Sequence, residues 1–283
     1  MEFTLSRDRD RINVDVDGVR SHAFDPAALT LTDDDPLEVE QNPRPYGKRL
    51  FEALFPTESA ARNALAALTA RDSLRLVLLD DALQRLPWEY LRDPSDRTAD
   101  EGFLALKYVI MRALPATLRT TMPAASGSAR VLVVASDPAV DAHDVPIPAL
   151  DIERGRRELI KVFERTAAAL DVHFLQPATL DSLHGALAET AAGGTAIHFL
   201  GHGIARPSGA ALFFEDRAGN AHEVAARDLI APAGGRARLV FLNACESATT
   251  LESPMSNAAY QLALAGVPYA VGMQFEVPEV VAL

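Results

Sequence analysis

The chain has 283 residues, of which 48% are hydrophobic and 23% are charged, and its formal net charge is -12 at pH 7. This length and composition predict a globular protein of one large or two ordinary domains. The acidic balance, without any dense Lys/Arg block, argues against direct nucleic-acid binding and against a membrane-surface partner. The opening residues show no signal-peptide pattern, no apolar run reaches membrane-spanning length, and a single cysteine excludes an internal disulfide. We therefore expect a cytoplasmic protein.

The first third of the chain predicts a small α/β unit. Asp17 and Gly18, which follow a β-like run, are typical of a hairpin turn. A helix is expected to begin after Thr57, and Thr57 is the candidate N-cap of that helix. We expect Trp88, the only tryptophan, to belong to the core. The other expected elements are strands at 12–16, 74–79 and 103–111 and a helix at 46–54.

A charge-free stretch of small residues, PAASGS at 123–128, marks the predicted domain boundary. We therefore expect an N-terminal α/β extension over residues 1–123, a linker over 124–128 and a second domain over 129–283.

The second domain is predicted to alternate strands and helices. Alternation of this kind is typical of a mostly parallel sheet sandwiched by helices, with right-handed crossovers. An additional hairpin is expected at 210–224. The expected strands are 130–135, 172–175, 195–200, 238–242 and 267–272, and the expected helices are 150–170, 181–190 and 254–265.

Two of these strands end in reactive side chains. The strand that ends at Leu200 is followed by Gly201, His202 and Gly203, and the one that ends near Asn243 is followed by Cys245. Open α/β sheets bind ligands at the carboxyl ends of their strands, so the thiol and the imidazole are expected to be neighbours. A cysteine attacks a carbonyl as its thiolate and needs a base, which His202 supplies. The amides of Gly203 and Cys245 are candidates for holding the oxyanion.

Other interpretations of these residues stay open at this point. A single cysteine at the end of a buried strand is often only a small apolar residue. His198 lies in the middle of an apolar run, which is typical of a core histidine. A zinc site made by His198, His202 and Cys245 would lack a convincing fourth ligand.

The two strand ends together resemble a known family. Residues 197–203 read IHFLGHG and residues 242–248 read LNACESA. They resemble the histidine and cysteine signatures of the CHAT domain, a caspase-like cysteine protease family of the caspase, separase and gingipain group. Segments 86–91, 148–153 and 265–274 also resemble family segments, so the likeness spans roughly residues 45–283.

The resemblance implies a caspase-type fold and a Cys245/His202 dyad that cuts peptide bonds without a metal or organic cofactor. It also implies that Asp137 and Asn243 line the subsite for the substrate residue before the scissile bond, where Asp137 would favour a basic side chain. Asp137 precedes Pro138, however, and is equally typical of a turn. The local caspase signature around the cysteine is absent, so aspartate specificity is not expected.

The function predicted is that of a cysteine endopeptidase, a triggered effector in bacterial anti-phage defence or programmed cell death. Its expected partners are a protein substrate and a regulatory or sensor protein or domain. Residues 1–123 are expected to resemble the degenerate pseudo-protease region of related enzymes. The family pattern also leads us to expect a further helix and an edge strand beyond residue 283. The alternatives are a catalytically silent caspase-like scaffold and a thiol acyl-hydrolase or acyl-transferase.

Overall fold

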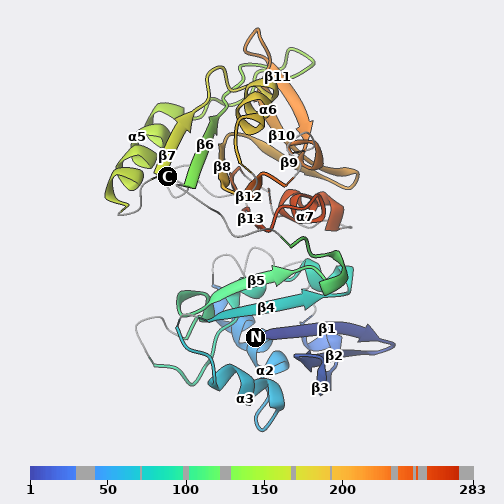
Figure 1. Cartoon of the computed structure of the whole chain (residues 1–283). Coiled ribbons are helices and arrows are strands. Elements are labelled where there is room, and N and C mark those ends of the chain that lie inside the picture. The colour runs from blue at the N-terminus through green and yellow to red at the C-terminus, as the bar shows by residue number, and fades with distance from the viewer. Residues whose placement is uncertain are drawn as a thin grey trace. The chain divides into compact units, whose positions relative to one another are not determined.

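The computed structural model describes residues 1–29, 42–70, 72–97, 102–121, 129–166, 170–191, 193–230, 235–244, 247 and 254–273. The chain divides into two compact units, residues 1–115 and residues 116–283 (Figure 1). The predicted linker at 124–128 lies outside the described residues.

The first unit is built on a five-stranded sheet in the order β3-β2-β1-β4-β5. Strands β1, β2 and β3 pair antiparallel, whereas β4 pairs parallel to both β1 and β5. Asp17 and Gly18 have positive φ angles of 47° and 84°, which confirms the predicted hairpin turn between β2 and β3. The elements are β1 (Glu2–Asp8), β2 (Arg11–Val16), β3 (Val19–Phe24), η1 (Pro26–Leu29), α2 (Pro43–Leu54), α3 (Ala60–Ala66), β4 (Ser73–Leu78), α4 (Asp81–Gln84), η2 (Trp88–Tyr90), η3 (Leu104–Leu106) and β5 (Val109–Ala113).

Two expectations for this unit were wrong. Helix α3 is capped by Ser59, whose hydroxyl accepts a hydrogen bond from the Arg62 amide at 3.0 Å, and not by Thr57. Glu58 has a left-handed φ of 64°, so the helix begins only beyond it. The strand expected from residue 103 begins at residue 109, because η3 precedes it and the Tyr108 amide donates to the Leu104 carbonyl at 2.8 Å.

Trp88 belongs to the core of the first unit, as predicted. Its side chain is fully buried, and its indole Nε1 donates to the Leu83 carbonyl at 2.8 Å. A buried indole N–H normally requires such a partner. The same core contains apolar residues from α2, α3 and the strands, among them Phe3, Leu50 and Phe51.

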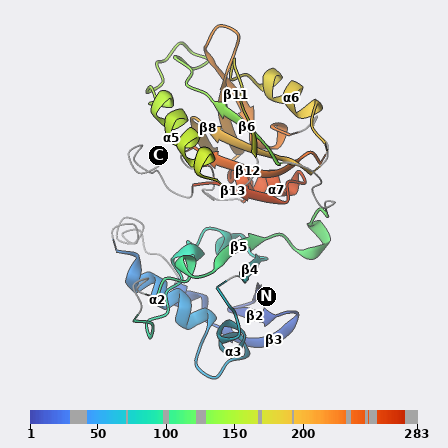
Figure 2. The same ribbon diagram turned by 60° about the vertical axis from the view of Figure 1, so that its left-hand side comes forward.

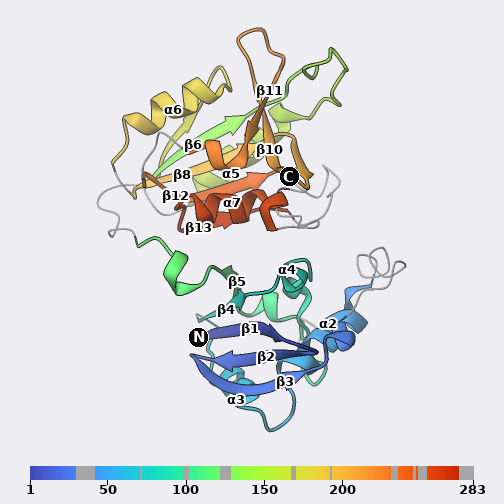
Figure 3. The ribbon, with the colours of Figure 1, turned by 90° about the vertical axis from the view of Figure 1, so that its right-hand side faces the viewer.

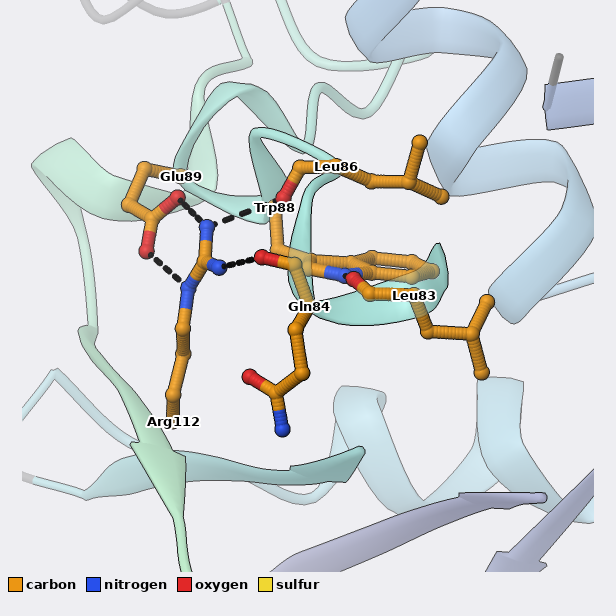
Figure 4. Close-up of polar contacts among 6 residues, drawn as sticks. All are labelled: Leu83, Gln84, Leu86, Trp88, Glu89 and Arg112. Carbon is orange, nitrogen blue, oxygen red and sulfur yellow. Dashed lines mark hydrogen bonds and ion pairs between the residues drawn. The ribbon is translucent and has the colours of Figure 1, made fainter. Parts of the chain in front are cut away.

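Arg112 on β5 attaches the segment around Trp88 to the sheet (Figure 4). Its Nε and one terminal nitrogen bind the two carboxylate oxygens of Glu89 at 2.9 and 2.8 Å. The same guanidinium also donates to the carbonyls of Gln84 and Leu86. One side chain thereby binds four acceptor oxygens of the segment 84–89.

The second unit carries the sheet predicted from the β/α alternation. Its order is β13-β12-β8-β6-β7, and all four pairings are parallel, which confirms the prediction. Helix α5 covers one face of this sheet, and α6 and α7 cover the other (Figures 2 and 3). The elements are η4 (Ala116–Leu118), β6 (Ala129–Ala135), α5 (Ile152–Arg165), β7 (Leu170–Phe174), α6 (Leu180–Ala188), β8 (Thr195–Leu200), β9 (Gly203–Arg206), β10 (Gly209–Glu215), β11 (Ala221–Ala225), η5 (Ala226–Asp228), β12 (Ala237–Asn243), η7 (Pro254–Ser256), α7 (Ala258–Leu264) and β13 (Tyr269–Val271).

A small antiparallel sheet, β11-β10-β9, packs against the α6 and α7 side of this core. The hairpin β10–β11 was predicted, whereas β9 was not. Phe214 of β10 contacts Phe199 of β8, with ring centroids 5.2 Å apart. Because β9 begins at Gly203, the small sheet starts directly after His202.

Candidate active site

Strands β6, β8 and β12 end at the same level. In the parallel register Ala135 lies opposite Leu200, and Leu200 lies opposite Asn243. The pairing continues one residue further, since the Ser136 amide donates to the Leu200 carbonyl at 2.9 Å and the Gly201 amide donates to the Asn243 carbonyl at 3.2 Å. Strand β6 lies between β7 and β8, so this edge is a topological switch point, where open α/β sheets place their ligands.

His202 follows β8 by two residues, and its ring orientation is fixed by a backbone carbonyl. Its Nε2 lies 2.8 Å from the carbonyl oxygen of Pro148. A carbonyl oxygen only accepts hydrogen bonds, so Nε2 carries the hydrogen in the neutral ring. Among the described residues no partner is bonded to Nδ1. The neutral ring therefore has Nδ1 as its unprotonated nitrogen, which is able to accept a proton.

Gly201, which directly precedes His202, allows the end of β8 to lie close to the backbone that follows β6. A side chain built there would place its Cβ 2.9 Å from the Ser136 carbonyl oxygen and 2.9 Å from the Phe199 ring. Since Cβ atoms do not tolerate such contacts, only glycine fits without a shift of the strand end.

Gly203 has an amide that the small sheet leaves unused. The Phe213 amide donates to the His202 carbonyl at 3.0 Å, which makes His202 and Phe213 a hydrogen-bonded pair. The next pair, Gly203 and Leu212, is then non-hydrogen-bonded, because the two kinds of pair alternate in an antiparallel ladder. The N–H of Gly203 consequently points away from β10.

The cysteine predicted as the nucleophile, Cys245, lies outside the described residues. On one side of it the structure describes Ala244, which is buried, and on the other it describes Ser247. The Ser247 amide donates to the Ala244 carbonyl at 3.3 Å, and the Ser247 hydroxyl accepts a hydrogen bond from the Met273 amide at 2.9 Å. The flanks of positions 245–246 are thus bonded to one another and to the residues after β13.

The two predicted substrate-binding residues lie at the same edge. Asn243 is the last residue of β12 and is half-buried. Asp137 follows β6 by two residues and is also half-buried, and its Oδ1 accepts a hydrogen bond from the Leu150 amide at 3.0 Å. Its own amide donates to the Glu215 carboxylate at 3.2 Å. Asp137 is therefore already part of a local hydrogen-bond network.

Sequence reasoning missed Pro148 and Glu215 as members of this site. Pro148 stood in a segment noted only for its family likeness, and Glu215 stood at the end of a hairpin strand. A cavity of about 340 Å³ adjoins this network at the carboxyl ends of β6 and β7. Its charged lining residues are Glu153, Arg156 and Glu215.

His198 lies on β8 but has a different environment from His202. Its ring stacks on Phe241, with centroids 5.0 Å apart and planes 12° apart. Its Nε2 is buried and has no hydrogen-bond partner among the described residues, which is unusual for a core histidine. Burial lowers its pKa from 6.5 to about 4. In the described part of the chain no three His, Cys, Asp or Glu side chains form a metal-binding group.

Comparison with known proteins adds a family to this geometry. A family model described as CHAT domain matches residues 44–283. The match begins within α2, so it includes much of the first unit as well as the second. A search of curated proteins found no match. None of the helices that the structure describes is both long and apolar enough to cross a membrane.

Proposed function

The chain belongs to the CHAT domain family, which is caspase-like, and we propose on this premise that it is a cysteine endopeptidase. Cys245 is the nucleophile and His202 the base, and the substrate is a protein. In the cell the protein is a triggered effector of bacterial anti-phage defence or programmed cell death, with a sensor protein or domain as its regulator. The observation that carries the proposed chemistry is the bond from His202 Nε2 to the Pro148 carbonyl, which leaves Nδ1 as the base.

The chemistry follows from this orientation. Nδ1 of His202 takes the proton of the Cys245 thiol, and the thiolate attacks the scissile carbonyl carbon. The negative charge that develops on the carbonyl oxygen is held by the Gly203 N–H. The protonated His202 then gives its proton to the leaving amine, and an acyl-enzyme remains on Cys245. Water, deprotonated by the same ring, hydrolyses the thioester and restores the thiol.

The substrate residue before the scissile bond lies beside Asn243 in this proposal. Asn243 is the last residue of β12 and precedes Cys245 by two positions. It lies beside the end of β8, where the Gly201 amide donates to its carbonyl oxygen. Exchange of Asn243 for Ala is expected to raise KM for peptides more than it lowers kcat. A change in kcat alone would place Asn243 outside the substrate subsite.

Labelling by a thiolate-reactive probe tests the dyad without knowledge of the substrate. In the full chain we expect the probe to label Cys245 and the labelling rate to fall when His202 is replaced by Ala. His222→Ala, which changes an exposed histidine of β11, is the matched control and is expected to keep the wild-type rate. Equal labelling rates with and without His202 would support a silent scaffold. Turnover of a small thioester without peptide cleavage would support an acyl-hydrolase or acyl-transferase.

A further inference from the structure

The segment between β6 and α5 carries the carbonyl that orients His202. It runs from Asp137 to Leu150, and its acceptor for His202 is Pro148. Proline has no N–H, so Pro148 cannot be anchored by a hydrogen bond of its own amide. The position of its carbonyl depends on the bonds made by its neighbours.

Two hydrogen bonds flank Pro148. On one side the Ile147 amide donates to the Ala139 carbonyl at 3.0 Å, within the segment itself. On the other side the Leu150 amide donates to Oδ1 of Asp137 at 3.0 Å. The Asp137 carboxylate is thus the group that holds the chain between Pro148 and the first turn of α5.

Asp137 is itself fixed to the small sheet. Its amide donates to a carboxylate oxygen of Glu215 at 3.2 Å, and Glu215 is the last residue of β10. The turn after β10 holds the same segment, since the Ala139 amide donates to the Gly219 carbonyl at 3.2 Å and the Ala221 amide to the Val140 carbonyl at 2.8 Å. The first residues of the segment, 137–140, are therefore held in place by β10 and the turn after it. The position of Leu150 in turn depends on the Asp137 carboxylate.

We propose that Asp137 is a positioning residue, which acts on His202 through Leu150 and the Pro148 carbonyl. This inference rests on the proposed function and assigns Asp137 a different task from the selection of a basic substrate side chain. The positioning task requires an acceptor oxygen at Oδ1, whereas selection of a basic side chain requires a negative charge. Asparagine supplies the oxygen without the charge, so the two tasks can be separated.

Peptide cleavage by the full chain with Asp137→Ala and Asp137→Asn is the first arm of the test. Asp137→Ala is expected to lower kcat by about 10- to 100-fold at little change in KM, because a misplaced base costs rate. Asp137→Asn is expected to keep most of the activity and the wild-type choice of substrate residue. An Asn variant that is folded, as inactive as the Ala variant and without preference for basic residues would overturn the proposal.

A matched control comes from the same segment. Asp141 accepts hydrogen bonds from the His143 and Val145 amides at 2.8 and 2.9 Å, whereas the Leu150 amide donates to Asp137. Asp141→Ala removes the same kind of carboxylate-to-backbone bond and is expected to keep the wild-type kcat. An equal loss of kcat in Asp141→Ala and Asp137→Ala would mean that any loosening of the segment impairs the protein, and it would contradict a specific role of Asp137.

The second arm of the test measures the tautomer of the His202 ring directly and does not depend on peptide cleavage. Nitrogen NMR of the full chain with labelled histidine reports which ring nitrogen carries the hydrogen, and His202→Gln assigns the signal. Wild type and Asp137→Asn are expected to show the Nε2–H form, and Asp137→Ala a mixture of both forms. A wild-type chain that shows this pattern but cleaves nothing would contradict the protease and leave the positioning role intact. An unchanged Nε2–H form in Asp137→Ala would overturn the positioning role.

Discussion

His198 couples the stability of the second unit to pH. Its pKa is lowered to about 4 by burial, whereas an unfolded histidine titrates near 6.5. Between these values the unfolded chain binds more protons than the native one, so the free energy of unfolding decreases as pH falls from 6.5 to 4. The loss amounts to about 3 kcal/mol for a shift of this size.

Denaturant unfolding at pH 7 and pH 4.5 measures this coupling. We expect His198→Leu to lose much less stability between the two pH values than the wild type does. His222→Gln, at an exposed position, is expected to behave as the wild type. The same pH dependence in His198→Leu and wild type would show that other groups carry it.

Gly201 is the residue at which the strand end tolerates no side chain. Gly201→Ala is expected to destabilise the protein by about 1–3 kcal/mol, because the added Cβ meets a backbone oxygen and must push the end of β8 away. The displacement also moves His202, so peptide cleavage is expected to fall.

Gly185 in α6 provides the contrast for Gly201. A Cβ built at Gly185 meets nothing within 4 Å, so Gly185→Ala is expected to raise stability by up to about 1 kcal/mol through helix propensity. Thermal unfolding of both variants is the measurement. A neutral Gly201→Ala would show that the strand end has room.

At the scale of elements, Arg112 is the side chain that attaches segment 84–89 to β5 in the first unit. Glu89 is partly removed from water, which opposes its ionisation, but the charge and hydrogen bonds of Arg112 outweigh this and lower its pKa. Arg112→Ala removes the guanidinium donor from the Gln84 carbonyl and one of the two donors from the Leu86 carbonyl, which still accepts from the Trp88 amide at 2.9 Å. The substitution is expected to destabilise the unit by about 1–3 kcal/mol.

The fluorescence of Trp88 reports on this segment, because the chain has one tryptophan. In Arg112→Ala we expect a lower unfolding midpoint and an emission shifted to the red, since the indole gains contact with water. Arg75→Ala, at an exposed position of β4, is expected to change neither. A midpoint in Arg112→Ala equal to that of Arg75→Ala would contradict the role of Arg112.

The elements that sequence reasoning predicted are those whose patterns are local. The buried strands β6, β8 and β12 form continuous apolar runs. The ends of the runs before His202 and Cys245 sufficed to predict that these two strand ends lie at one edge of the sheet, and β8 and β12 do end side by side. Strand β9 was missed because it is short, half-buried throughout and joined to β8 by only two residues. The bond from His202 to Pro148 joins residues 54 positions apart, and no local pattern predicts such a contact.

At the scale of the whole molecule, the chain consists of two compact units, each with its own five-stranded sheet and its own buried core. A fragment of residues 1–115 is therefore expected to fold alone and to unfold cooperatively with urea, with Trp88 as the probe. Circular dichroism and fluorescence transitions that coincide would support this expectation. A gradual transition without a baseline would show that the first unit depends on the second.

The family match includes much of the first unit and all of the second. Sequence reasoning predicted its extent closely, because the upstream segment around Trp88 already resembled the family. The mostly parallel sheet was predicted from the alternation of strand and helix patterns, and the caspase-like fold was predicted from the resemblance to the family. The geometry at His202 could not be predicted in the same way, because it arises where the segment after β6, the end of β8 and the small sheet meet.

The most direct measurement of the proposed activity is cleavage of a peptide library by the full chain, with the cut sites identified by mass spectrometry. Wild type, Cys245→Ala and His202→Ala are compared, together with candidate partner proteins as triggers. We predict that wild type cuts peptide bonds and that both variants lose this activity while they remain folded. Cleavage that persists in Cys245→Ala would contradict the assignment of the nucleophile, and cleavage that persists in His202→Ala would contradict the assignment of the base.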